Sequence, residues 1–301
     1  MLTATSRLHR RLGGYLAERF PPVVYTVLVA LFFGSALLFA RALDPYGGGS
    51  YRAPMQPIVC LGAAVVWLAF LHLRLMDEHK DFEPDREAYP DRLLSRGVVT
   101  LPLLGRVLVG VVLLEAILAS LLGGIALAWW GAMFLFTLAM RYEFGVGRWL
   151  SGHILVYALT HNPVVGLLAV FALAATGLAW DPRYLVYVAV VSVSSLAFEV
   201  GRKTREPGEE ISGVESYSTA FGRAGAARLL QGLVLLTVVL GVLLVGLVGH
   251  GLQAGVATAV LVLSAVLAVH FSRPGQPAKR VELGSSIFLL GCFFSVGVAA
   301  W

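Results

Sequence analysis

Runs of about 20 apolar residues follow one another along the chain, and each is long enough to cross the hydrocarbon core of a membrane as a helix. The composition agrees with this, because 58% of the 301 residues are hydrophobic and only 14% are charged. Soluble domains typically carry about 25% charged residues. Because only helices and closed barrels satisfy their backbone groups in lipid, the sequence predicts an all-α membrane protein.

Nine such spans can be drawn. They cover residues near 22–43, 55–76, 98–121, 124–141, 150–177, 183–201, 223–248, 251–271 and 283–301. These spans use nearly the whole chain, so we expect a single transmembrane domain over 1–301. Residues 1–20 carry several arginines and no apolar run, which predicts an amphipathic lead-in at the membrane surface.

The basic residues fall almost entirely on one side of the predicted membrane. Of the 23 Lys and Arg residues, all but Arg41, Arg52 and Arg183 lie in the N-terminal segment, in alternate connections or in the span ends beside those connections. Loops rich in Lys and Arg stay in the cytoplasm, so we predict a cytoplasmic N-terminus and an outside C-terminus in a cell or inner membrane. Four tryptophans at the predicted outer boundary fit an aromatic belt. They are Trp129, Trp130, Trp180 and Trp301.

The loop over 74–97 contains the most acidic stretch of the chain. From Asp77 to Gly97 it reads DEHKDFEPDREAYPDRLLSRG. Asp77, Asp81 and Asp85 are spaced four residues apart, so on a helix they share one face. Carboxylates stacked on one face repel each other unless a cation lies between them. Mg²⁺ prefers oxygen ligands and is often shared with substrate phosphates. The alternative is a solvated, charged connector without a ligand.

A second charged loop, 199–222, occupies the corresponding place after the sixth span. We expect its first residues to continue the preceding helix until Pro207 and Gly208 end it. Acidic and basic side chains alternate on that helix, at Glu199, Arg202, Lys203 and Glu206. They form either pairs that neutralise one another or a mixed wall that faces the first loop.

Polar side chains inside the spans are few, and they mark candidate cavity residues. Glu115 lies near the middle of the third span, and the fifth span carries His153, Tyr157, His161 and Asn162. Ionisable groups in a bilayer usually face a cavity or a partner. A hydrogen bond between helices is the alternative role.

The first loop resembles the signature of the UbiA superfamily of intramembrane prenyltransferases, NDxxDxxxD followed by an element like R-P-L-x-x-G. The spacing is kept from Asp77 to Asp85, and Arg92 to Gly97 follows. Asp77 stands where the family has Asn, Glu78 stands where it has the first Asp, and Leu93 replaces Pro.

The second loop departs from that pattern. Its tail from Gly213 to Gly222 is similar to the family's, but glutamates replace the aspartates and basic residues lie among them. Because a basic side chain can bind a phosphate directly, Arg202 and Lys203 could take the place of a second metal.

The resemblance implies a UbiA-like bundle of nine transmembrane helices. It also implies Mg²⁺-dependent transfer of an isoprenyl group from a prenyl diphosphate to an aromatic or lipid acceptor that remains unidentified. The expected partners are this donor, the acceptor and the lipid bilayer, with no nucleic acid. The implied catalytic carboxylates are Asp77, Asp81 and Asp85. The implied metal ligands are the same three residues together with Glu78 and Glu199. The implied diphosphate contacts are Arg92, Arg141, Arg148, Arg202 and Lys203, and the implied cavity residues are Glu115, Tyr157 and Asn162.

Two alternatives stay open. A UbiA-like terpene cyclase would ionise the same donor and close it on itself, so product would form without an acceptor. A lipid-binding membrane protein would keep the fold without turnover, and the basic second loop favours this alternative.

Overall fold

A computed structural model describes residues 4–44 and 55–301, and within these residues all regular structure is helical. Arg52, one of the three basic residues predicted on the non-cytoplasmic side, is not among the described residues. The helices are α1 (Ala4–Arg19), α2 (Pro22–Leu43), α3 (Met55–Lys80), α4 (Phe82–Ala88), α5 (Leu101–Leu121), α6 (Gly124–Arg141), α7 (Gly147–Leu150), α8 (Ile154–His161), α9 (Pro163–Ala174), α10 (Tyr184–Arg202), α11 (Tyr217–Val248), α12 (Gly251–Phe271) and α13 (Ala278–Ala300). Short 3₁₀ turns cover Glu143–Gly145 and Pro207–Glu209.

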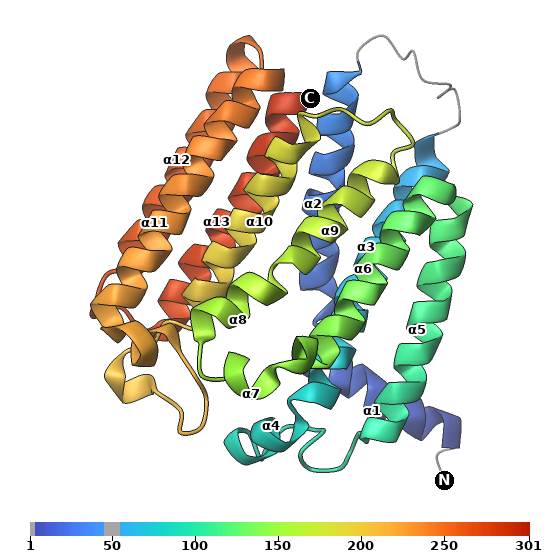
Figure 1. The fold of residues 1–301 in the computed structure, drawn as a ribbon, viewed down its shortest axis with the longest axis vertical. Coiled ribbons are helices and arrows are strands. Elements are labelled where there is room, and N and C mark those ends of the chain that lie inside the picture. Colours follow the sequence, from blue (N-terminus) through green and yellow to red (C-terminus); the bar gives the residue numbers. More distant parts are fainter. Residues whose placement is uncertain (1–3, 45–54) are drawn as a thin grey trace.

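Nine spans in the described part of the chain are long and apolar enough to cross a membrane, which confirms the predicted number. They are α2, the Val59–Lys80 part of α3, α5, α6, α8 with α9, and α10 to α13. The long helices stand side by side, and the short helices α1, α4 and α7 gather at one end of the bundle (Figure 1). The C-terminus lies at the other end (Figure 1), as an odd number of crossings requires.

The outer surface of the bundle is apolar, as a lipid-facing surface has to be. Val109, Leu113 and Ile117 on α5 are each more than half exposed. In water such a row would be a large exposed apolar patch, whereas in a bilayer it faces acyl chains. Trp180 and Trp301 are also exposed. Trp130 is buried, so its predicted place in an aromatic belt is wrong.

Close packing between α10 and α13 depends on Gly201. A Cβ atom added there would lie 1.8 Å from Oγ of Ser285, so only glycine lets the two helices approach this closely. Gly201 immediately precedes Arg202, the last residue of α10. This contact therefore holds the end of α10, where the second charged loop begins, against α13.

The fifth span is not the single helix predicted over 150–177. α7 is separate, and the span itself breaks between α8 and α9 at Asn162 and Pro163. Proline has no backbone N–H and cannot continue the hydrogen-bond ladder. Nδ2 of Asn162 donates to the carbonyl of Ser192 on α10 at 2.9 Å. The break is thus held by a hydrogen bond between helices, one of the two roles considered for Asn162.

Candidate active site

The first acidic loop contains the C-terminal end of α3 and the short helix α4, where the sequence predicted one continuous helical face. α3 ends at Lys80, and α4 begins at Phe82 after Asp81, whose ψ is 13°. The backbone bonds from Asp81 N to Asp77 O and from Asp85 N to Asp81 O, 2.8 and 2.9 Å, still bridge the interruption. The three aspartates thus keep helical spacing across the interruption, but their side chains have different partners.

Asp77 and Asp81 are the two half-buried carboxylates of this loop with no hydrogen-bond or ion-pair partner among the described residues. Burial raises the pKa of Asp81 to about 6. Lys80 opposes that rise, and the negative charges of Asp77, Asp85 and Glu143 add to it. Like charges close together raise a carboxyl pKa in this way. A cation placed between the two carboxylates would remove the repulsion.

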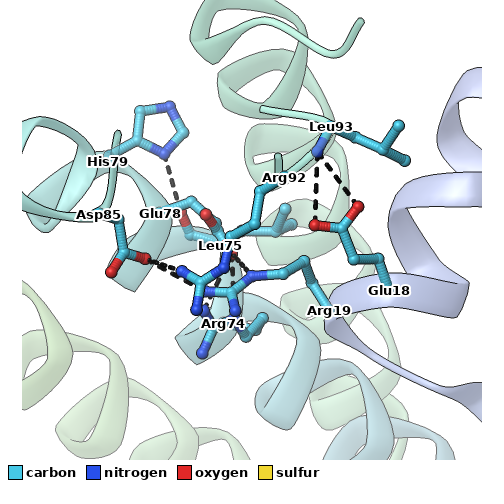
Figure 2. Close-up of polar contacts among 9 residues, drawn as sticks. All are labelled: Glu18, Arg19, Arg74, Leu75, Glu78, His79, Asp85, Arg92 and Leu93. Atoms are coloured by element: carbon cyan, nitrogen blue, oxygen red, sulfur yellow. Dashed lines mark hydrogen bonds and ion pairs between the residues drawn. The ribbon is translucent and has the colours of Figure 1, made fainter. Parts of the chain in front are cut away.

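Glu78 and Asp85 are held by arginines (Figure 2). Nε of Arg19 donates to Oε1 of Glu78 at 2.7 Å, and Nη2 of Arg74 donates to the same oxygen at 3.0 Å. Asp85 accepts from Nη1 of Arg92 at 2.5 Å and from Nη2 of Arg19 at 3.3 Å. Glu78 is only 3% exposed. These two acidic side chains are already neutralised by the protein itself.

The lead-in helix α1 packs directly against the first loop. Glu18 accepts a hydrogen bond from the backbone N–H of Leu93 at 3.1 Å (Figure 2). Tyr15 and Phe20 are buried in one apolar cluster with Leu94 and Val99 of the loop. The segment predicted as a lead-in at the membrane surface is therefore also packed against the acidic loop.

A second polar cluster joins α3, the turn after α6, and α8. Nζ of Lys80 donates a short hydrogen bond to the hydroxyl of Tyr157 and lies 3.2 Å from Oε1 of Glu143. Oε2 of Glu143 lies 3.4 Å from Nε2 of His161, whose ring stacks on Tyr157 at 3.9 Å. Glu143 and Phe144 both have positive φ, 51° and 52°. For residues other than glycine this backbone is strained, and such strain is common at functional sites.

The second charged loop begins earlier than predicted. α10 ends at Arg202, so the expectation that Glu206 continues this helix is wrong. Glu206 instead accepts from Nε of Arg223 and from the backbone N–H of Gly275, at 2.7 and 2.8 Å. It thereby fastens the loop to the connection between α12 and α13.

Glu199 pairs with both basic residues that follow it. Oε2 accepts from Nε of Arg202 at 2.5 Å, and Nζ of Lys203 lies 2.9 Å from Oε1. The same Lys203 ammonium lies 5.8 Å from the centre of the Tyr157 ring. Nζ of Lys80 lies 5.0 Å from the centre of that ring. The two loops therefore meet at Tyr157.

The remaining predicted residues are dispersed. Arg141 lines a small pocket together with Asp77, Lys80 and Thr137. Arg148 is exposed on α7. Glu115 is fully buried deeper in the bundle, where it accepts from Nε1 of Trp130 at 2.9 Å. The structure thus brings Asp77, Asp81, Arg141, Tyr157, Glu199 and Lys203 to one end of the bundle and leaves Glu115 and Asn162 inside it.

Arg19, Arg74, Lys80 and Glu143 were missed by sequence reasoning. Lys80 lies inside the acidic motif, so its position was a usable signal. Arg19 and Glu143 contact the motif only across 59 and 63 residues of sequence respectively. Nothing in the local pattern indicates such contacts.

Solved structures of similar shape decide the fold. A UbiA homologue from Aeropyrum pernix K1 superposes with a TM-score of 0.70 at 20% identity, over 91% of this chain and 96% of that one. A digeranylgeranylglyceryl phosphate synthase gives 0.63 at 15% identity, over 95% and 99%. The chain has the UbiA fold.

A third UbiA-fold relative extends the comparison to a structure with ligands. It is a UbiA homologue from Archaeoglobus fulgidus bound to DMAPP and Mg²⁺, with a TM-score of 0.54 at 14% identity over 90% of this chain and 98% of that one. Neither a family model nor a curated protein matches the sequence itself. The likeness therefore lies in the UbiA fold rather than in extended sequence identity.

The side chains at this end of the bundle can be compared with the ligands that a divalent cation requires. Among the described residues no three His, Cys, Asp or Glu side chains are arranged to hold a metal by themselves. Mg²⁺ is usually bound by one or two carboxylates together with waters and substrate phosphates. Asp77 and Asp81, unpaired and mutually repelling, are a pair of this kind. The residues present fit Mg²⁺ shared with a phosphate ligand.

Proposed function

We propose that this protein transfers an isoprenyl group from a prenyl diphosphate to a hydrophobic acceptor within the membrane. The observation that carries the proposal is the contrast among the acidic side chains. Glu78, Asp85, Glu143 and Glu199 all have cationic partners, whereas Asp77 and Asp81 have no ion-pair partner among the residues that the structure describes. Asp77 lines one small pocket with Lys80 and Arg141, and the Asp81 carboxylate lies close enough to Asp77 to repel it, so this end of the bundle offers a place for a cation and an anion together.

In this proposal Asp77 and Asp81 hold Mg²⁺, with Glu199 available from the second loop. Bound Mg²⁺ neutralises the charge that develops on diphosphate as it leaves. Glu78 and Asp85, which the resemblance implies as ligands, are assigned instead to positioning the loop through Arg19.

Lys80 and Arg141 are proposed to bind the diphosphate, and Arg202 and Lys203 to approach it from the second loop. Charge-assisted hydrogen bonds to phosphate oxygens are among the strongest that side chains make. Arg92 already binds Asp85 and lies 3.6 Å over the Tyr89 ring, and Arg148 points to solvent. We assign neither of these two a direct phosphate contact.

The site lies at the end of the bundle that bears α1, and we place this end in the cytoplasm from the distribution of Lys and Arg. Apolar side chains of α3 and α6, Leu73, Met76 and Met140, line the small pocket of the site. The half-buried carboxylates and cations therefore act in surroundings poor in water, where electrostatic stabilisation of a leaving anion is strongest. Exclusion of water would also protect an allylic cation from hydrolysis.

Two structures of a UbiA homologue from Archaeoglobus fulgidus, one bound to DMAPP and Mg²⁺ and one bound to GPP and Mg²⁺, support this choice of donor and metal. Purified protein should bind geranyl diphosphate with Mg²⁺ and release diphosphate when a suitable acceptor is added. Binding should be lost in excess chelator and return with Mg²⁺. Unchanged donor binding in chelator would contradict the proposed metal.

One observation favours the lipid-binding alternative. Arg202 and Lys203 both pair with Glu199, which reduces the charge they can offer to a diphosphate. Donor binding without release of diphosphate, over a broad set of acceptors, would favour that alternative. Diphosphate release and a cyclic hydrocarbon product without any acceptor would favour the terpene cyclase.

A further inference from the structure

A row of three polar side chains runs from the proposed diphosphate site into the middle of the bundle. Oγ1 of Thr137 on α6 lies 3.3 Å from Nε2 of His72 on α3. Nδ1 of His72 lies 3.3 Å from Oε2 of Glu115 on α5. His72 and Glu115 are 0% exposed and Thr137 is 2% exposed. Three separate helices therefore contribute a hydroxyl, an imidazole and a carboxylate to one hydrogen-bonded row.

The far end of the row is fixed and incompletely satisfied. Nε1 of Trp130 donates to Oε2 of Glu115 at 2.9 Å, which holds the carboxylate toward His72. Oε1 of Glu115 is buried with no hydrogen-bond partner among the described residues. An ionisable side chain at this depth is costly and in most proteins serves a function. A purely structural bridge between helices would not need a carboxylate with one bare oxygen.

The near end of the row opens on the proposed site. Thr137 lines the same small pocket as Asp77, Lys80 and Arg141. α6 ends at Arg141, so Thr137 lies about one helical turn, roughly 6 Å, farther inside the membrane. An acceptor group placed in this pocket would lie beside both Thr137 and the proposed diphosphate contacts.

The geometry allows two hydrogen-bond arrangements that differ by one proton. In the first, Thr137 donates to the carbonyl of Phe134, 2.7 Å away, Nε2 of a protonated His72 donates to Thr137, and Nδ1 donates to Glu115. In the second, the Thr137 hydroxyl turns to donate to Nε2 of a neutral His72, and Nδ1 still donates to Glu115. Both arrangements leave the imidazole satisfied, so the row can take up or give back one proton at Thr137.

We propose that Thr137, His72 and Glu115 form the proton acceptor for the prenyl acceptor, which we infer to carry a hydroxyl group. This inference rests on the proposed prenyl transfer. The bond between the allylic carbon and the diphosphate oxygen breaks, and a bond forms between that carbon and the acceptor oxygen. The acceptor proton passes to Oγ1 of Thr137 as the Thr137 proton passes to Nε2 of His72. Glu115 stabilises the resulting imidazolium, as the carboxylate does in other hydroxyl–imidazole–carboxylate sites.

Substitutions at Thr137 test the row with little change in shape. Thr137→Val removes the hydroxyl, and Thr137→Ser keeps it. Transfer from geranyl diphosphate with Mg²⁺ would be measured over a panel of phenols, naphthols and glycerol ethers. General acid–base groups contribute about 100-fold or more, so Thr137→Val should lose about 100-fold in kcat. Thr137→Ser should stay within about fivefold of the unaltered protein. Donor affinity should be unchanged in both variants.

The matched control is Thr237→Val on α11. Thr237 is also a fully buried helical threonine, and its hydroxyl donates to the carbonyl of Leu233 at 2.8 Å, away from the row. It should keep full transfer. Glu115→Gln should lower kcat without changing donor affinity, since glutamine still accepts from Trp130 but cannot stabilise an imidazolium.

A second readout does not depend on turnover. NMR of protein labelled with heavy nitrogen at histidine, with His72→Gln to assign the signal, reports which ring nitrogens carry protons. Nδ1 of His72 should be protonated in the unaltered protein, because it donates to Oε2 of Glu115 in both the neutral and the charged form of the ring. A proton found only on Nε2 in the unaltered protein would overturn the relay.

The outcomes separate the two proposals. No transfer to any hydroxylated acceptor by the unaltered protein, with diphosphate never released, would reject the proposed prenyl transfer and the relay with it. Full transfer by Thr137→Val would reject the relay alone. Release of diphosphate only with acceptors that lack a hydroxyl would overturn the inferred acceptor class.

Discussion

Nε of Arg19 lies 2.7 Å from Oε1 of Glu78, although 59 residues separate the two in sequence. This ion pair joins the N-terminal helix to the acidic motif. Its Glu78 side is almost completely buried. Removing one partner of such a pair leaves a charge that the fold cannot hydrate.

Arg19→Gln should therefore destabilise the protein and loosen the first loop. Arg74 still neutralises Glu78 in part, so we expect a loss of about 1–3 kcal/mol. Thermal unfolding in detergent and hydrogen exchange over 74–97 would measure it. Arg11→Gln, on the exposed face of the same helix, is the matched control and should change neither. If Arg19→Gln/Glu78→Gln is no more stable than Arg19→Gln, the pair is not the cause.

Asp81→Asn should abolish Mg²⁺-dependent donor binding and yet stabilise the fold. The pKa of Asp81 rises from 3.8 to about 6, so the folded protein binds this proton more tightly than the unfolded chain does. Stability is therefore lost as pH rises from about 4 to about 6, and at neutral pH the ionised Asp81 opposes folding by about 1–3 kcal/mol.

The measurement for Asp81→Asn is the unfolding temperature in chelator. The variant should unfold at a higher temperature than the unaltered protein at neutral pH, and the difference should vanish toward pH 4. Asp91→Asn, an exposed aspartate of the same loop, should change neither stability nor donor binding. A less stable Asp81→Asn at neutral pH would show that its carboxylate has a partner in the folded protein.

Arg202→Gln with Lys203→Gln should weaken donor binding about tenfold or more, because a charge-assisted hydrogen bond contributes about 1.5–3 kcal/mol. The affinity of the variant should also depend less steeply on salt. Arg202→Lys should be harmful as well, since a lysine cannot bond a phosphate in a bidentate manner. Arg228→Gln removes an exposed charge from α11 and is the control. If donor titrations give the double variant the same affinity as the unaltered protein, both residues serve only as ion-pair partners of Glu199.

A topology reporter fused after Trp301 should be active only outside the cytoplasm. One inserted at the exposed Gly208 should be active only inside. The reason is that both positions are assigned to their side of the membrane from the one-sided distribution of Lys and Arg. A cytoplasmic signal at the C-terminus would reverse the orientation, and the proposed site would then face away from soluble prenyl diphosphates.

The acidic motif illustrates how far the sequence could predict the site. The spacing of Asp77, Asp81 and Asp85 indicated a metal-binding loop, but it could not indicate which carboxylates are unpaired. That depends on Arg19, Arg92 and Lys80, whose positions follow from how α1, α3 and α4 pack. The row of Thr137, His72 and Glu115 could not be predicted either, because its members come from three helices.

The sequence by itself determined the number and approximate limits of the spans and the end of the bundle that carries charge. Both follow from local properties, namely the length of each apolar run and the sign of the charge beside it. The tertiary structure alone decided the break at Pro163, the early end of α10 at Arg202 and the partner of each acidic side chain. Ion pairs in a water-poor interior depend on distances of a few ångströms between helices remote in sequence. A pattern along the chain does not contain those distances.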